Sequence, residues 1–299
     1  KELFDMLSKK VSLLLSCFHL ISSVHPLTLA SKLSNVNMIF GGTKAVEMPP
    51  LYEGWFDKTR FIEKSIVGAV KSSYKVGQPI EVLFPSLPNL DEVSFGTKLN
   101  QEFGTMAAKE LGMPAYKPGS KIKTYLVQFS NIYWAKRLAE GIGSTVWGLC
   151  TDGLKKDDIK QPGKLKLASI NKPESFSQVK KGDTVIVIQP GTTEQWKFCL
   201  NKFSEQKLIF LNAPVTSTYD LGGPVENLRQ AYYCKRVSKG WAFICSPGPW
   251  TAYIEKPDRT VEKLRTYDEK PSLSALSKEV REESFKRYAI FNDRYAPGF

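Results

Sequence analysis

A short apolar run in the middle of the chain constrains the fold more than any other feature. Thr184–Ile188 reads Thr-Val-Ile-Val-Ile, so every residue after the threonine is β-branched and apolar. β-Branched residues favour strands, and an apolar run without polar alternation is typical of a strand that is buried on both faces. Such strands belong to parallel sheets that helices cover on both sides. The run therefore predicts an α/β fold.

Helical and strand-like patterns alternate around this run. Apolar residues at helical spacing predict helices over residues 61–70, 99–107, 132–138 and 196–203. Strand-like runs predict further strands over residues 80–84, 123–129, 165–170 and 207–211. This alternation is typical of a mainly parallel, Rossmann-like sheet.

The pattern changes after residue 230. Short strand-like runs over residues 231–237, 241–245 and 250–255 are separated by Gly and Pro turns, and a helical pattern follows over residues 273–288. We expect an antiparallel meander added to the parallel sheet, followed by a final helix. Because there is no internal repeat or low-complexity linker, residues 47–299 are expected to form a single α/β domain.

The first 46 residues have the composition of a targeting segment. Two lysines precede an apolar run over residues 11–24, and no Asp or Glu occurs between Asp5 and Glu47. The first part has the order of a secretory signal, and residues 26–46 have the hydroxyl-rich, basic composition of a transit peptide. Together they resemble the bipartite presequence of algae with secondary plastids. The alternative is a retained, extended N-terminal arm.

The chain is strongly basic, with a formal net charge of +12. Residues 1–46 contain five lysines and two acidic residues, a net charge of +3, which leaves +9 for residues 47–299. This excess favours an anionic partner, namely a nucleic acid, an anionic membrane surface or an acidic protein face. The alternative is a solvated basic surface without a specific partner.

Histidine is missing from the body of the chain, because the only two histidines are His19 and His25. Nucleophile systems that use His as a base, and metal sites with His ligands, are therefore excluded there. The five cysteines form no Cys-x-x-Cys motif and match no zinc or iron–sulfur spacing, so we interpret them as structural thiols. We predict no catalytic residues, no cofactor and no metal.

Gly191, Thr192 and Thr193 are the best local candidate for a binding site. They follow the apolar strand and precede a predicted helix, at the sheet edge where open α/β proteins bind ligands. Backbone N–H groups at such a helix start can hold an anion. The alternative is a tight turn in which Thr192 or Thr193 caps the helix.

Aromatic and basic residues are interleaved in the C-terminal strands, a pattern that nucleic-acid-binding sheets also show. The set comprises Tyr232, Tyr233, Trp241, Trp250 and Tyr253, with Lys235, Arg236, Lys239 and Lys256. Aromatics at these positions more often face the core, so nucleic acid is not among the expected partners. A plastid RNA-binding protein stays an alternative.

The C-terminal half resembles an uncharacterised domain family of plastids and cyanobacteria that includes the LOW PHOTOSYSTEM II ACCUMULATION type of assembly protein. The residues that carry the resemblance are Leu211-Asn212, Tyr232-Tyr233, Gly240, Pro247-Gly248-Pro249-Trp250 and Pro271-Ser272. The N-terminal match, around residues 80–85, is looser. The resemblance implies a Rossmann-like plastid domain linked to photosystem biogenesis, without established catalytic residues.

The expected function is therefore non-enzymatic. We expect an assembly factor, or an auxiliary subunit bridging photosystem and antenna, on the stromal side of the thylakoid membrane. Its partners would be photosystem core or antenna proteins and the membrane surface. The aromatic residues near the C-terminus are candidate contacts: Tyr288, Phe291, Tyr295 and Phe299. An enzyme or binder acting on a phosphorylated or nucleotide-like small molecule is the alternative.

Overall fold

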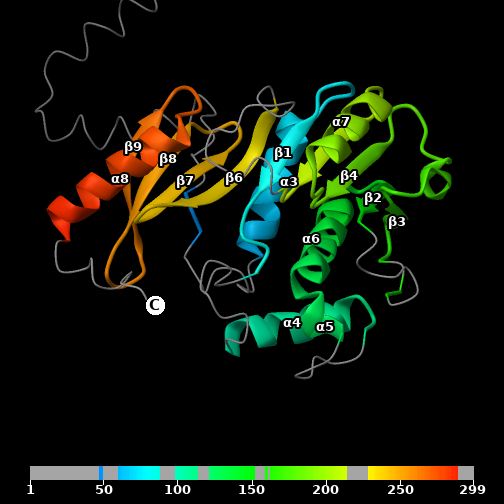
Figure 1. Cartoon of the computed structure of the whole chain (residues 1–299), viewed down its shortest axis with the longest axis horizontal. Helices are drawn as coiled ribbons and strands as arrows, with labels where there is room; N and C mark the ends of the chain where they lie inside the picture. The colour runs from blue at the N-terminus through cyan, green and yellow to red at the C-terminus, as the bar shows by residue number, and fades with distance from the viewer. Residues whose placement is uncertain are drawn as a thin grey trace, which may run out of the picture. The chain divides into compact units, whose positions relative to one another are not determined.

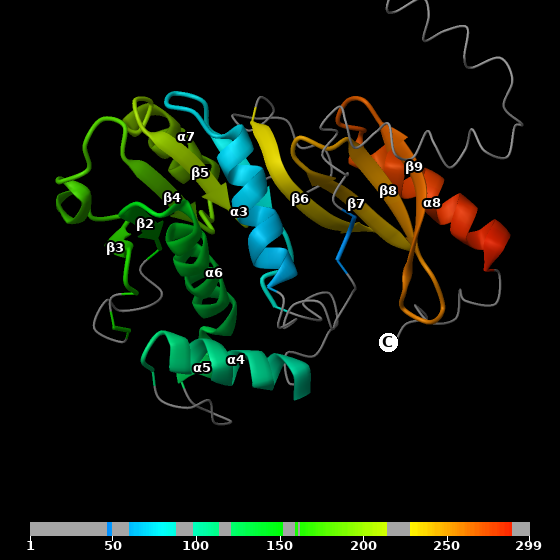
Figure 2. The same cartoon turned by 180° about the vertical axis from the view of Figure 1, so that it is seen from behind.

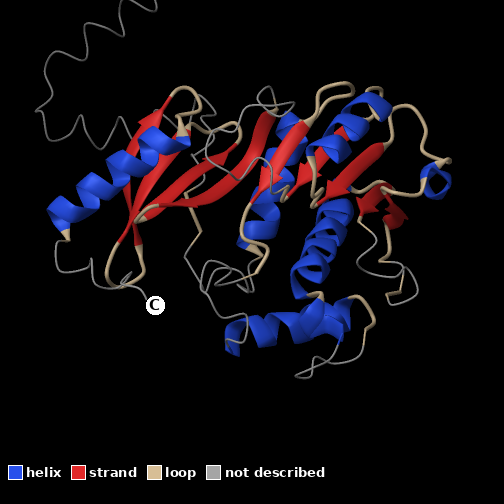
Figure 3. Cartoon of the chain, in the orientation of Figure 1, coloured by secondary structure: helices blue, strands red, loops and turns tan. Residues whose placement is uncertain are grey.

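A nine-stranded mixed sheet runs through the residues that the structure describes (Figure 3). The structure is a computed structural model. The strand order of the sheet is β3-β2-β4-β5-β1-β6-β7-β8-β9. Residues 45–299 form one compact unit, and residues 1–44 lie outside the described part. The described residues are 47–49, 60–87, 98–113, 121–151, 159–160, 162–213 and 228–288.

Six neighbouring strands form the parallel part of this sheet. They are β1 (Ile80–Leu83), β2 (Val146–Cys150), β3 (Leu165–Ser169), β4 (Thr184–Ile188), β5 (Lys207–Leu211) and β6 (Arg229–Val237). The predicted strands at residues 80–84, 165–170, 184–188 and 207–211 are confirmed. The strand β2 was not predicted.

The antiparallel part begins on β6. β6 pairs with β7 (Gly240–Cys245), which pairs with β8 (Trp250–Glu255), which pairs with β9 (Val261–Tyr267). The final helix α8 (Leu273–Arg287) follows and packs on β8 and β7, in front of them in Figure 1. The predicted meander and final helix are confirmed, with β9 as an additional strand.

Helices cover both faces of the sheet. α3 (Phe61–Ser73) and α6 (Leu126–Ile142) pack on one face, and α3 lies in front of the strands in Figure 2. α7 (Thr193–Lys202) packs on the opposite face over β4 and β5, and α8 covers the same face over the antiparallel strands. The other helices of the described part are α4 (Lys98–Glu110), α5 (Lys121–Thr124) and the short 3-10 helix η3 (Pro173–Phe176).

The apolar strand β4 is buried on both sides, as its sequence predicts. Ile186 and Ile188 belong to the core beneath α3 and α6. Val185 and Val187 belong to the core beneath α7, where the Trp196 ring stacks on that of Phe210 at 4.0 Å. Both covering layers are therefore required to keep this strand out of water.

The prediction of a strand over residues 123–129 is wrong. This segment forms α5 and the first turn of α6. Ile122, Leu126 and Phe129 are all buried, and their spacing of four and three residues places them on one helical face. The segment Tyr-Leu-Val contains residues that suit a strand. The helical spacing of the buried residues continues into the predicted helix at 132–138, however, and their packing on one face favours a helix over a strand.

Gly240 marks a point where two elements approach too closely for any side chain. A Cβ atom at this position would overlap the backbone carbonyl oxygen of Tyr253 and lie 2.6 Å from Cγ1 of Val280 on α8. The glycine therefore permits both the pairing of β7 with β8 and the seating of α8 on the sheet.

We predict that Gly240→Ala lowers the free energy of unfolding by about 2 kcal/mol or more, because backbone atoms cannot move aside as a flexible side chain can. Chemical denaturation monitored by circular dichroism measures this loss. Gly68→Ala in α3 is the matched control: no atom lies within 4 Å of its added Cβ, so it should stabilise the helix by up to about 1 kcal/mol. Equal effects of the two substitutions would contradict the close-packing argument.

Candidate functional site

A network of side-chain amides lies at the carboxyl ends of the central parallel strands. The Asn212 amide, just after β5, donates to Oδ1 of Asn131 on α6 at 2.6 Å. The Asn131 amide in turn donates to Oε1 of Gln189, just after β4, at 3.2 Å. Oδ1 of Asn212 accepts the backbone N–H of Phe84, which follows β1, at 2.8 Å. Three strands and one helix are thus tied together at the edge where α/β proteins bind ligands.

Two members of this amide network have left-handed backbone conformations. Gln189 has a φ of 47° and Asn212 a φ of 50°. Asparagine tolerates this region, whereas a glutamine there is strained. Backbone bonds hold both residues in place, from Gln189 N to Leu211 O at 2.9 Å and from Asn212 N to Val82 O at 2.8 Å.

Hydroxyl and indole groups extend the polar edge. Oγ of Ser130 donates to Oγ of Ser86 at 2.8 Å, and Nε1 of Trp134 donates to the Ser86 carbonyl at 2.8 Å. All of these groups are neutral, and they form hydrogen bonds with one another or with the backbone. The network contains no acid or base that titrates near neutral pH.

The candidate residues Gly191, Thr192 and Thr193 lie at the same edge, where the turn after β4 leads into the first residue of α7. Thr192 is the N-cap of α7 and its Oγ1 accepts the Gln195 N–H at 3.3 Å. The Gly191 N–H donates to Oε1 of Gln195 at 2.8 Å. The structure thus shows the capped turn that was the alternative interpretation. Anion binding there stays a prediction, and an anion would have to replace Gln195 at the Gly191 N–H.

Glu194, in the first turn of α7, adds negative charge beside this turn. Its own backbone N–H and the Thr192 hydroxyl lower the pKa of the Glu194 carboxyl. The side chain is therefore ionised at neutral pH, where it complements the positive end of the helix dipole. A second anion at the same helix start would meet this carboxylate.

We predict that Asn212→Ala lowers the unfolding free energy by about 2–4 kcal/mol, because it removes two partly buried hydrogen bonds and places an alanine, which tolerates this region less well than asparagine, in a left-handed conformation. Asn212→Gly loses the same bonds but tolerates the backbone angle, so it should be the more stable variant. Urea titration of both proteins measures the difference. If the alanine variant is as stable as the glycine variant, the left-handed backbone angle at residue 212 does not contribute to the loss of stability.

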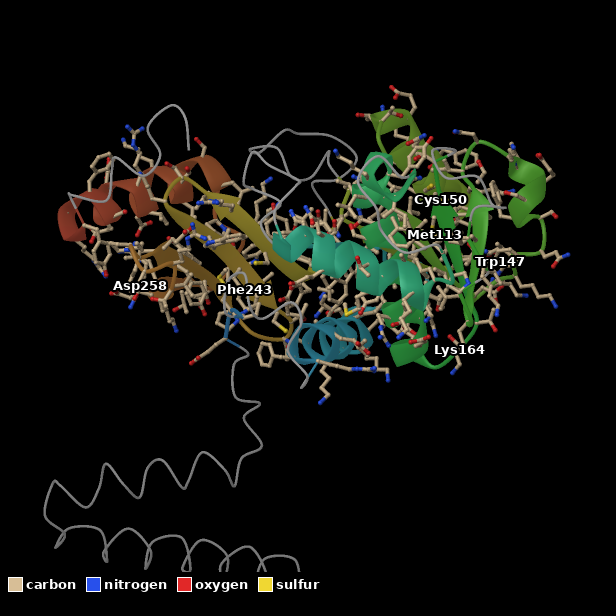
Figure 4. All side chains as sticks on the ribbon, turned by 90° about the horizontal axis from the view of Figure 1, so that it is seen from below. Met113, Trp147, Cys150, Lys164, Phe243 and Asp258 are labelled. Carbon is tan, nitrogen blue, oxygen red and sulfur yellow. The ribbon has the colours of Figure 1, made fainter. Side chains whose placement is uncertain are left out.

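The cysteines in the described residues are buried and none forms a disulfide. Cys150, which is labelled in Figure 4, ends β2. Its Sγ lies 3.5 Å from the Ala168 carbonyl oxygen. Burial raises the pKa of the Cys199 thiol to about 12 and that of Cys245 to about 11. These thiols remain protonated at neutral pH and are therefore poor nucleophiles.

The raised thiol pKa values predict a loss of stability in alkali. Below pH 9 a thiol is protonated in both the folded and the unfolded chain, so it contributes no pH dependence. Between pH 9 and about 12 the unfolded chain ionises at Cys199 while the folded chain does not, and the unfolding free energy falls by up to about 4 kcal/mol. Unfolding curves at several pH values should show a shallower decline for Cys199→Ala; an unchanged slope would contradict this assignment.

The interleaved aromatic residues of the meander face the core. Trp241 is 3% exposed, and Trp250, Tyr232, Tyr233 and Tyr253 are also buried. Tyr232 contacts Phe243 edge-to-face at 5.5 Å between ring centroids. These rings are not available to stack on bases, so the pattern that suggested nucleic-acid binding has a packing explanation.

The residues that carry the family resemblance have structural positions. Tyr232 and Tyr233 point to opposite faces of β6, toward α3 and α8 respectively. Gly240 allows α8 to approach β7, and Oγ of Ser272 caps α8 by accepting the Ala275 N–H at 3.4 Å. Only Asn212 among them belongs to the amide network.

An open groove runs along the outer side of α8, between this helix and the turn that joins β6 to β7. Its volume is about 770 Å³. The residues that line this α8 groove are Ser238, Ser274, Ser277, Lys278, Arg281, Glu282 and Phe285. Sequence reasoning missed the groove, because its residues are an ordinary solvent-facing pattern until the turn is placed beside them.

The C-terminal aromatic candidates are only partly described. Tyr288 is the C-cap of α8, and its hydroxyl donates to Oε2 of Glu262 on β9 at 2.8 Å. Phe291, Tyr295 and Phe299 lie outside the described residues. The structure therefore shows Tyr288 as a link between α8 and β9, and the contact role of the segment stays a prediction.

Within the described residues, no three His, Cys, Asp or Glu side chains are grouped so that they could hold a metal ion. Among the helices described, none has both the length and the apolar composition to cross a bilayer. No protein-family model matches the chain, and neither the curated proteins nor the solved structures include a significant match.

Proposed function

We propose that this chain is a non-enzymatic plastid protein that associates with photosystem core or antenna proteins, as an assembly factor or an auxiliary subunit. The observation that carries the proposal is the open α8 groove in the same C-terminal part that resembles the photosystem-assembly family. A shallow, open and amphipathic surface suits a protein partner, whereas small-molecule sites are concave and largely enclosed.

The chemistry of the carboxyl edge supports a non-enzymatic role. Asn131, Gln189 and Asn212 use their amides largely on one another and on the backbone. A side chain that fixes the scaffold in this way is not poised to accept a proton or attack a substrate. The carboxyl edge therefore holds the strand ends and α6 together rather than presenting reactive groups.

Location on the stromal side of the thylakoid, behind a bipartite presequence in residues 1–46, belongs to the same proposal. The charge of about +9 on residues 47–299 supports it, because the lipid and protein surfaces there are anionic. Each basic residue near such a surface adds about 1 kcal/mol, screened within a Debye length of about 8 Å. Stable association requires apolar contacts as well, which the groove and the aromatic C-terminal segment can supply.

We also propose that the parallel part belongs to the Rossmann-like class. Six parallel strands with α3 and α6 on one face and α7 on the other support this assignment. Their order, β3-β2-β4-β5-β1-β6, differs from the 3-2-1-4-5-6 order of the dinucleotide-binding type.

We predict that the protein co-migrates with a photosystem or its assembly intermediate on native gels of gently solubilised thylakoids, and that part of this association resists salt. Deleting residues 291–299 should weaken the co-migration more than replacing Lys197 and Lys202 on α7, which changes charge alone. The measurement is an immunoblot after the native gel has been run in a second, denaturing dimension, with thylakoids from an alga that has a secondary plastid. A free monomer at low salt, in both thylakoid and stromal fractions, would overturn the proposal.

A small-molecule binder is the second candidate, and the strained Gln189 favours it. Backbone strain of this kind gathers at functional sites, and here it lies at the ligand-binding edge of the sheet beside Gly191, Thr192 and Thr193. A phosphorylated or nucleotide-like ligand would be recognised there. This candidate moves ahead if the protein is a free monomer in the native gels.

A further inference from the structure

We infer that the α8 groove binds an acidic amphipathic segment of a partner protein. The inference rests on the proposed partner-binding function and names the surface and the chemistry that it would use. Three properties of the groove carry it: its charge, its exposed aromatic ring and its shape.

The groove has cations that the fold does not use. Lys278 and Arg281 are exposed and have no ion-pair partner among the described residues, and of those that line the groove only Glu282 is acidic. The opposite side of α8 differs, because its charges pair with β9: Arg287 with Glu262 at 2.6 Å and Arg265 with Glu279 at 3.2 Å. The uncompensated positive charge of α8 therefore lies on the groove side.

An aromatic ring lies beside these cations. Phe285 is 38% exposed, which is a large fraction for a phenylalanine, and the Arg281 guanidinium lies over its ring at 5.5 Å from the centroid. Arginine and exposed aromatic rings are typical of the centres of protein interfaces. A partner residue that covers Phe285 would bury apolar surface and bring a carboxylate within reach of Arg281.

The shape of the groove suits a helical or extended segment. It follows α8 from Ser274 to Phe285, a length of about 16 Å at 1.5 Å per residue. The Ser238 N–H donates to Oγ of Ser277 at 3.1 Å, which holds the β6–β7 turn against the helix and fixes the second wall. About three turns of a partner helix fit along this length.

Other occupants fit less well. Vesicles of anionic lipid, used as a probe below, distinguish a membrane surface from a protein segment. The outer side of a second α8 would bring Lys278 and Arg281 against the same cations, and like charges in contact disfavour such a pair. An acidic amphipathic segment satisfies both the charge and the exposed ring.

The groove residues can be changed without loss of the fold. α8 is held on the sheet by Leu273, Leu276 and Val280, which are buried and point away from the groove. Lys278, Arg281 and Phe285 are exposed, so substitution there should leave the unfolding curve near that of the unchanged protein.

The test uses a fluorescent four-turn helical peptide with Glu on one face and Leu on the other, titrated into the full chain and followed by anisotropy. We expect saturable binding that weakens at least tenfold in the Lys278→Glu/Arg281→Glu double variant and in Phe285→Ser. The control Lys197→Glu/Lys202→Glu on α7 changes the net charge equally and should bind as the unchanged protein does. Equal loss in the control would overturn the inference.

Three further probes make the test specific. The same peptide with Lys in place of Glu should not bind, and polyglutamate should bind much more weakly because it cannot cover Phe285. If polyglutamate, or vesicles of phosphatidylcholine and phosphatidylglycerol, bind as tightly and lose binding in the same variants, the groove is a general anion or lipid surface and the inference fails. If both groove variants still co-migrate with a photosystem, the groove is not the binding surface, and only the groove inference fails. If the protein binds the peptide but does not co-migrate with a photosystem, only the proposed photosystem function fails.

Discussion

The pairing of β1 with β6 is the interaction on which the rest of the structure depends. β1 lies between β5 and β6, so it is the last link between the parallel strands and the antiparallel extension. β6 is parallel to β1 and antiparallel to β7, and it is long enough to serve both neighbours. The register shifts between Glu81 and Val82, and Gln230 on β6 donates to Oε2 of the buried Glu81 at 3.2 Å. Because α3 packs on β1, β6 and β7 together, the two parts share one core.

The parallel and antiparallel parts that meet at the β1–β6 pairing carry two different kinds of surface. The amide network closes the carboxyl edge of the parallel part with hydrogen bonds between its own members, whereas the α8 groove opens on the antiparallel part. A closed polar edge stabilises the scaffold, and an open groove leaves contact surface for a partner. The proposed function uses only the second of these surfaces.

The sequence predicts the elements that have an uninterrupted apolar pattern. All four residues that follow Thr184 in β4 are apolar, and apolar residues recur at helical spacing in the final helix, so both elements were predicted. β2 was missed because Gly148 interrupts it; a Cβ there would lie 2.9 Å from Cδ1 of Leu165, and only the folded sheet shows why no side chain is present. β9 was missed because it is an edge strand whose bulge breaks its alternation of polar and apolar residues. The candidate sites depend on contacts between distant segments, as between Asn131 and Asn212, which no local pattern records.

The residues of the family resemblance and the residues of the groove have different physical roles, and this difference bears on how such a domain could serve different partners. Gly240, Ser272 and the tyrosines of β6 hold α8 and the meander in place, so replacing them would disturb the fold. Lys278, Arg281 and Phe285 support no buried contact that the scaffold needs. A chain can therefore keep the first set and vary the second. If the groove binds a partner as proposed, its charge and aromatic content can therefore change the choice of partner without a change in the scaffold.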